Sequence, residues 1–90
     1  MLTDEQKQLI SKNIKNEYRI ATWDEKASDI IPFIRSVGYV DATILARFIF
    51  KSPNKHDLAF SRMVLNNLFK IGTLAYENGV YCLNNGGSQH

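Results

Sequence analysis

The sequence feature that most restricts the fold is Asn78-Gly79, which separates two short β-prone runs near the end of the chain. Asn-Gly favours the two-residue type I′ turn of a β-hairpin, because both central residues of that turn need positive φ. A hairpin closed by this turn places Leu74 opposite Leu83, and successive side chains along each strand point to opposite faces of the hairpin. An isolated hairpin is barely stable in water, so we expect its leucine and tyrosine face to lie on helices.

A first helix is expected from about residue 4 to residue 18. Thr3 with Gln6 forms a capping-box pattern at its start. Its apolar side chains form a narrow stripe, made of Leu9, Ile10, Ile14 and Tyr18. The stripe fits either docking on the domain or pairing with a second copy, and we expect a homodimer through this helix.

A second helix is expected from the repeated capping pattern of Thr22 with Glu25. Its apolar residues keep helical spacing, but Pro32 interrupts the pattern. Because proline disturbs a helix interior, either this helix kinks or Asp29 caps a new one that contains Pro32 in its first turn. Gly38 is expected to end the helix.

Two further helices are expected before the hairpin. Asp41 can cap a short helix within residues 41–50, and Ser52 with Pro53 can start a longer one that runs to about Lys70. The short helix is expected to bury Ile44, Leu45, Phe48 and Ile49. The long helix is expected to bury a stripe that contains Leu58, Phe60, Val64, Leu65 and Leu68.

The charge of the chain is unevenly distributed. The formal net charge is only +2, but residues 30–70 carry six basic and two acidic residues, whereas residues 1–29 carry five basic and six acidic ones. On the long helix, Lys55, Arg62, Asn66 and Lys70 follow one another at spacings that place them on one side. An anionic partner would suit this side. On charge alone, a solvated basic face without a partner explains it equally well.

The order helix, short capped helix, longer helix and hairpin resembles a winged helix-turn-helix domain over residues 29–84. YVDATILARFIF is similar to the helix that leads into the turn, and LAFSRMVLNNLFKIGTLAYENGVYCLN resembles a recognition helix that feeds into a wing. The resemblance implies an α+β, mostly helical fold, with one domain over residues 1–84. Residues 1–20 would add an N-terminal helix, and residues 85–90 would form a flexible tail.

Two departures from this pattern affect the expected function. The link KSPNKHD is longer and more polar than a tight helix-turn-helix connection. The wing tip Glu77-Asn78-Gly79 has no Arg or Lys, although wings that touch DNA usually reach a phosphate or the minor groove with a basic residue. We therefore expect a structural wing.

The resemblance implies double-stranded DNA as the partner, with the helix at about residues 53–71 in the major groove. Arg62 fits a bidentate contact with guanine and Asn66 one with adenine, while the lysines fit phosphates. The candidate DNA contacts are Lys51, Lys55, His56, Arg62, Met63, Asn66, Asn67 and Lys70. The predicted function is sequence-specific DNA binding by a small transcriptional regulator. The alternative is a winged-helix module that binds another protein, which exposure of Met63 and Phe60 would favour.

The sequence gives little support to catalysis. His56 and Asp57 are adjacent, and adjacent side chains on a helix point in different directions. Cys82 is the only cysteine, which excludes an intrachain disulfide and a cysteine-based zinc site. We therefore predict no enzyme activity, no metal and no cofactor. The longest apolar run is far below the roughly 18 residues of a membrane span, and the polar start is unlike a signal peptide. A soluble cytoplasmic protein without membrane contact is expected.

Overall fold

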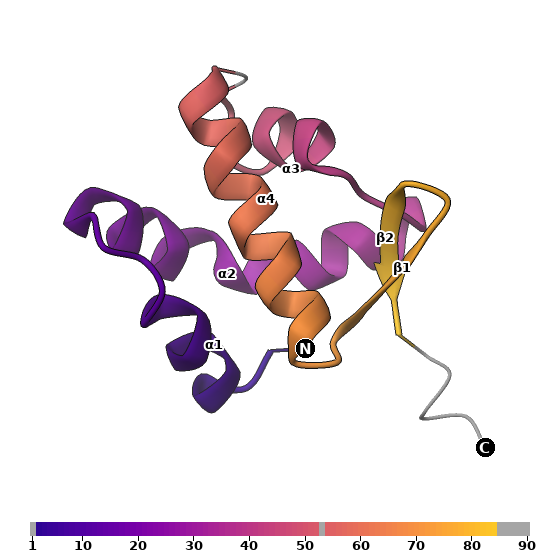
Figure 1. The fold of residues 1–90 in the computed structure, drawn as a ribbon, viewed down its shortest axis with the longest axis horizontal. Helices are drawn as coiled ribbons and strands as arrows, with labels where there is room; N and C mark the ends of the chain where they lie inside the picture. Colours follow the sequence, from indigo (N-terminus) through magenta and orange to yellow (C-terminus); the bar gives the residue numbers. More distant parts are fainter. Residues whose placement is uncertain (1, 53, 85–90) are drawn as a thin grey trace.

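The computed structural model describes residues 2–52 and 54–84, and within them the chain forms four helices and one two-stranded antiparallel sheet (Figure 1). This confirms the expected α+β, mostly helical class. The predicted tail at residues 85–90 lies outside the described residues. The elements are α1 (Asp4–Ser11), α2 (Glu17–Val37), α3 (Ala42–Phe48), α4 (Lys55–Lys70), β1 (Leu74–Glu77) and β2 (Val80–Leu83).

The N-terminal helix is shorter than predicted. The capping box of Thr3 and Gln6 is present, but α1 ends at Ser11 instead of reaching residue 18 or 20. Asn16 then starts α2, because its side-chain oxygen accepts hydrogen bonds from the backbone N–H groups of residues 18 and 19. The break lets Ile14, which is 6% exposed, turn into the core.

α2 is one continuous helix, so the predicted start at Thr22 is wrong. Of the two alternatives at Pro32, a new helix capped by Asp29 does not form. The Thr22 hydroxyl instead donates to the carbonyl oxygen of Tyr18, one turn earlier. Pro32 lies within the helix and is exposed. Because proline has no N–H, the carbonyl of residue 28 loses its helical hydrogen bond, but on this exposed side it can reach water. Gly38 ends the helix in the left-handed conformation, with φ +100°, as predicted.

The hydrophobic core begins well before residue 29, where the predicted winged-helix core starts. Trp23 is fully buried, and its indole Nε1–H donates to the carbonyl oxygen of Lys7 at 3.1 Å. Ile10 is fully buried as well. The two residues bring α1 and the first half of α2 into the same core as the later elements. That core contains Ile10, Ile14, Trp23, Ala27, Ile30, Ile31, Ile34, Val40, Leu45, Phe60, Val64, Leu65, Leu68 and Leu74.

The caps of α3 and α4 explain where these two helices begin. The Asp41 side chain accepts from the N–H of Ile44 at 2.8 Å, as expected for an N-cap. α4 begins later than predicted: Asn54, not Ser52, caps it by accepting from the N–H of Asp57. The predicted first-turn residue Pro53 lies outside the described residues.

The expected burial holds for most apolar positions on α3 and α4. Phe60, Val64, Leu65 and Leu68 are buried. Phe48 is the main exception, because it is 56% exposed and stacks beside the half-buried ring of Phe33 instead of entering the core. Leu58 and Ile44 are half-buried at the edge of the helix pair.

The hairpin has the predicted register and turn. Leu74 lies opposite Leu83, and Asn78 and Gly79 have φ of +52° and +84°. Val40, in the segment between α2 and α3, pairs with Tyr81 through two backbone hydrogen bonds of 2.7 and 2.8 Å. This bridge and the buried side chain of Leu74 attach the hairpin to the helices.

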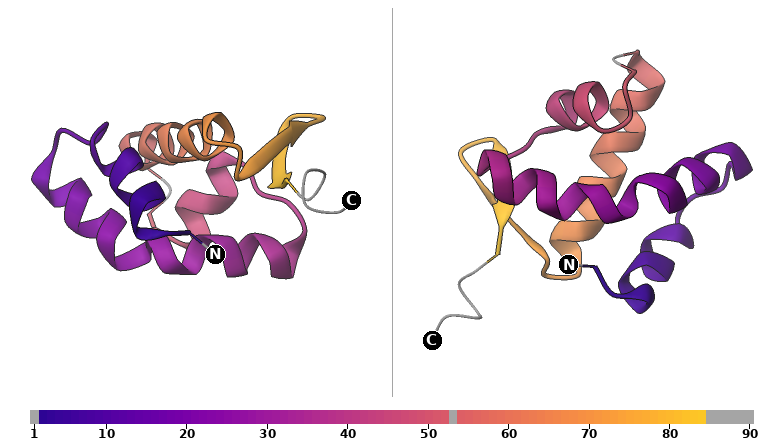
Figure 2. Two further views of the ribbon diagram at one scale, coloured as in Figure 1. Left: turned by 90° about the horizontal axis from the view of Figure 1, so that it is seen from below. Right: turned by 180° about the vertical axis from the view of Figure 1, so that it is seen from behind.

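α4 and α2 lie on opposite sides of the molecule, as Figure 2 (left) shows. Along the side that carries α4, the α1–α2 turn (residues 12–16) lies at one end and the hairpin at the other. α4 is therefore a central ridge with a projecting segment on each flank. None of the helices within the described residues has the length and apolarity needed to cross a membrane.

We expect Gly79→Val to lower the stability of the domain. A Cβ at this position meets no atom within 4 Å, so the cost comes from the backbone, which a β-branched residue resists at φ +84°. The expected loss is about 1–2 kcal/mol, which lowers the melting temperature by roughly 4–8 °C per kcal/mol. Gly79→Asn is the control, because asparagine tolerates this conformation. Equal melting temperatures for the Val variant and the wild type would contradict the turn assignment.

Candidate functional site

The candidate surface is the exposed face of α4. Lys55, Arg62, Asn66 and Lys70 are all exposed on it, which agrees with the face predicted from their spacing. Among the described residues, none of the three cations forms an ion pair. The surface therefore offers three cationic side chains and one amide to a partner.

The next row of α4 is turned toward the α1–α2 turn and is less available than predicted. His56 is exposed, but Met63 is half-buried against the core. Asn67 is also half-buried: its Nδ2 donates to the carbonyl oxygen of Met63 at 2.7 Å, and its Oδ1 accepts from Asn13 Nδ2 at 2.6 Å. Met63 thus helps to complete the core, and Asn67 has a structural role that its position in the sequence did not indicate.

Lys51, the remaining candidate, lies outside α4. It is exposed in the α3–α4 connection with φ +59°, and the N–H of Ser52 closes the end of α3 by donating to the carbonyl oxygen of Ala46. This left-handed cap is a position at which glycine is more usual. Lys51 therefore follows the end of α3, which is at Phe48, and presents its charge near the beginning of α4.

The only acid of α4, Asp57, is turned inward. It is 6% exposed and forms an ion pair with Arg19 of α2, whose guanidinium also lies 5.2 Å from the centre of the Phe60 ring. Burial by itself would raise the pKa of the Asp57 carboxyl. Hydrogen bonds from Ser52 and Arg19, together with the charge of Arg19, outweigh burial and hold this pKa below its ordinary value of 3.8.

A groove runs along the flank of α4 that faces the α1–α2 turn. It has a volume of about 460 Å³, and its polar lining is basic or neutral: Asn13, Lys15, Asn16, Arg19 and His56, with Ile14, Phe60 and Met63 beneath. Lys15 was not among the predicted site residues, because residues 4–18 were expected to form one continuous helix. The polar run KNIKN with a capping asparagine is the local signal that could have indicated a turn.

The opposite flank of α4, toward the hairpin, is aromatic. Phe69 and Tyr76 are 45% and 53% exposed, and the half-buried ring of Tyr81 lies between them, with centroid distances of 6.4 and 4.9 Å. Arg62 shares a hollow with Tyr76 and Tyr81 on this side. The hairpin tip adds one exposed carboxylate, Glu77, and no cation.

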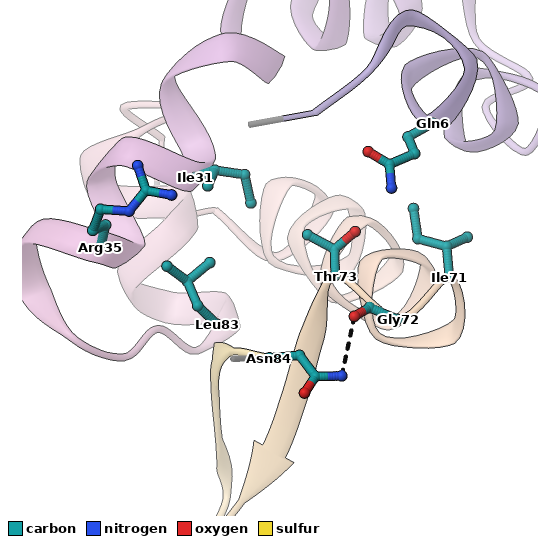
Figure 3. A pocket seen from close by; sticks show the side chains of 8 residues that line it. All are labelled: Gln6, Ile31, Arg35, Ile71, Gly72, Thr73, Leu83 and Asn84. Carbon is teal, nitrogen blue, oxygen red and sulfur yellow. Dashed lines mark hydrogen bonds between the residues drawn. The ribbon is translucent and has the colours of Figure 1, made fainter. Parts of the chain in front are cut away.

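A further hollow of about 280 Å³ lies between α2, the α4–β1 turn and the end of β2 (Figure 3). Asn84 Nδ2 closes one side by donating to the carbonyl oxygen of Gly72 at 3.1 Å. Arg35 is the cation of its lining, while the hydroxyl of Thr73 is shielded from solvent and has no hydrogen-bond partner. The lining contains no carboxylate or imidazole that could transfer a proton. No group of three or more potential metal ligands occurs in the part of the chain that the structure describes.

We expect Asp57→Asn to destabilise the protein and to change how its stability depends on pH. At neutral pH the substitution leaves the Arg19 guanidinium, 20% exposed, without its carboxylate, at a cost of roughly 2 kcal/mol. Because the folded pKa lies below the unfolded one, the stabilisation is fully present above about pH 4 and is lost as pH falls through the folded pKa. Urea unfolding between pH 7 and pH 2 measures this.

The matched control for this substitution is Asp24→Asn, which removes an exposed carboxylate from α2. The difference in unfolding free energy between wild type and Asp57→Asn should shrink toward acid pH. A constant difference over the whole range would contradict the role of the ion pair.

Comparison of the chain with models of protein families, with curated proteins and with solved structures found no match.

Proposed function

We propose that this protein is a small sequence-specific DNA-binding protein of the winged-helix type, acting in transcription regulation, with α4 as the helix that enters the major groove. The observation that carries the proposal is the exposed face of α4, where Lys55, Arg62, Asn66 and Lys70 lie together and the only acid of the helix points away. Cations and amides without acids are the composition that DNA requires of a contact surface.

The arrangement of the elements supports this proposal. α3 packs on α4, α4 leads directly into the hairpin, and the Val40 bridge fixes the hairpin beside the helices. This is the order and placement expected for two helices of a helix-turn-helix followed by a wing. α4 has 16 residues and so extends for about 24 Å, and a helix of this kind fits a major groove about 12 Å wide.

The residues of α4 divide into two roles. Arg62 lies near the middle of the exposed face, where a planar guanidinium can pair with the O6 and N7 of guanine, and Asn66 follows one turn later. Lys55 lies at the beginning of the helix and Lys70 at its end, positions suited to phosphates on either side of the groove. Lys51 and His56 add polar groups near the beginning.

The second candidate function is protein binding, and a different observation favours it. Phe60 and Met63, which would have formed an apolar patch, are buried and half-buried. Tyr76 and Phe69, however, are exposed, and Tyr76 shares a hollow with Arg62. Aromatic residues with arginine are the typical centre of a protein interface.

The proposal includes a homodimer, although its contact is smaller than the sequence suggested. Ile10 and Ile14 of the N-terminal stripe are buried in their own chain, which leaves Leu9 at 43% and Tyr18 at 73% exposure. We expect light scattering of the wild type to give a dimer mass at high concentration and Tyr18→Ser to lower it. A wild type that stays monomeric at every concentration would contradict the dimer.

We expect Arg62→Ala and Lys55→Ala to weaken DNA binding in different ways. Losing a base contact at Arg62 should cost roughly 1–3 kcal/mol and blur the sequence preference. Losing a phosphate contact at Lys55 should weaken binding to all sequences alike and reduce the slope of log K against log salt by about one. Affinity measured against salt on a selected site and on random duplex separates the two effects.

Two results decide between the candidate functions. If the wild type shows no salt-dependent binding to any duplex, the DNA proposal fails and protein binding takes its place. Tyr76→Ser serves as the control on the aromatic flank, because it should leave DNA affinity unchanged if α4 alone reads the site. Glu77→Lys should, if anything, tighten non-specific binding by removing a repulsive charge.

A further inference from the structure

We propose that the α1–α2 turn, through Lys12 and Lys15, supplies the main contact with the DNA backbone beside α4, and that the wing does not. This inference rests on the proposed function and deepens it, because it names a part of the interface that the resemblance to winged-helix domains does not imply.

The turn and the hairpin lie on opposite flanks of α4. A helix in the major groove has a phosphate backbone on each of its flanks. On the side of the molecule that carries α4, the α1–α2 turn lies along one flank and the hairpin along the other (Figure 2, left). A duplex placed on α4 therefore brings one backbone over the turn and the other over the hairpin.

The two segments that flank α4 differ in charge. The hairpin tip presents Glu77, which repels phosphate, and no cation. The turn presents Lys12 and Lys15, both exposed and, among the described residues, without an ion pair. Of the two segments that flank α4, the turn is therefore the one whose side chains can replace the counterions of a phosphate strand.

The groove between the turn and α4 is suited to an anion. No Asp or Glu occurs in its lining, and its polar groups are the side chains of Asn13, Lys15, Asn16, Arg19 and His56. The nearby carboxylate of Asp57 is already neutralised by Arg19. Because Arg19 and Asp57 offset each other, a phosphate strand along this groove meets hydrogen-bond donors and the positive charge of Lys15, and no carboxylate in the lining.

Two contacts hold the turn in place. Asn13 Nδ2 donates to Asn67 Oδ1 of α4 at 2.6 Å, and Ile14 beside it is 6% exposed. A turn fixed to α4 at both a polar and an apolar contact keeps a constant distance from the reading face. Because the turn is already ordered, the entropy cost of ordering its backbone and side chains on binding is smaller.

The experiment compares Lys12→Ala and Lys15→Ala with Lys26→Ala, each in the full chain. Lys26 lies on α2, beside Glu25, and its loss changes the net charge equally. Each turn variant should reduce the slope of log K against log salt by about 0.9. Between about 50 and 200 mM salt, the affinity of the variant should therefore fall about three-fold less than that of the wild type. Lys26→Ala should keep the wild-type slope. Circular dichroism and thermal melting check that all three fold.

The outcomes distinguish this inference from the proposed function. If the wild type binds duplex, Arg62→Ala weakens binding and both turn variants behave like Lys26→Ala, the inference is overturned and the proposed function stands. If the wild type binds no duplex, both are overturned. If the turn variants have a smaller slope than the wild type and Lys26→Ala keeps the wild-type slope, the inference is supported.

Discussion

The burial of one face of α2 is the constraint on which the rest of the structure depends. Trp23, Ile30 and Ile34 of this face are fully buried, and each large apolar side chain removed from water contributes about 1.5–3 kcal/mol. α1 packs against the first half of the helix and β2 against the second half. Because both ends of the chain meet on α2, its length sets how far the α1–α2 turn lies from the hairpin, and α4 occupies the space between them.

The inward position of Asp57 connects this core to the candidate surface. An exposed carboxylate near the beginning of α4 would favour the helix through its dipole but would repel an anionic partner. The ion pair with Arg19 keeps the carboxylate close to the helix start and neutralises it. The same contact ties α2 to α4, so one interaction supports the packing of the two helices and the positive potential outside them.

The distribution of the remaining acids extends this separation of charge. Six acids are exposed on α1 and α2. Glu77 is the exposed acid of the hairpin, while the side chain of Asp41 is occupied as the cap of α3. Most exposed acids of the described residues thus lie on α1 and α2, where basic residues accompany them, whereas the exposed face of α4 carries cations and no acid. An anionic partner approaching from solution would be oriented toward α4 before contact, and salt would weaken this effect. A protein partner would need the exposed aromatic flank of Phe69 and Tyr76, whereas DNA would not.

The sequence by itself determined the local features. Asn78-Gly79 set the hairpin turn and its register, Gly38 and Asp41 set a helix end and a helix start, and the spacing of Lys55, Arg62 and Asn66 identified an exposed face. Each depends on backbone conformations or periodicities that neighbouring residues decide.

The tertiary structure decided the rest. Asn16 rather than Thr22 begins α2, because ending α1 early lets Ile14 and Trp23 enter one core. Arg19 meets Asp57 and Asn13 meets Asn67 across 38 and 54 residues of chain. No local pattern marks such partners, since the packing of whole helices determines which distant side chains meet. For the same reason, only the structure placed Lys15 in a groove with His56, Phe60 and Met63 of α4.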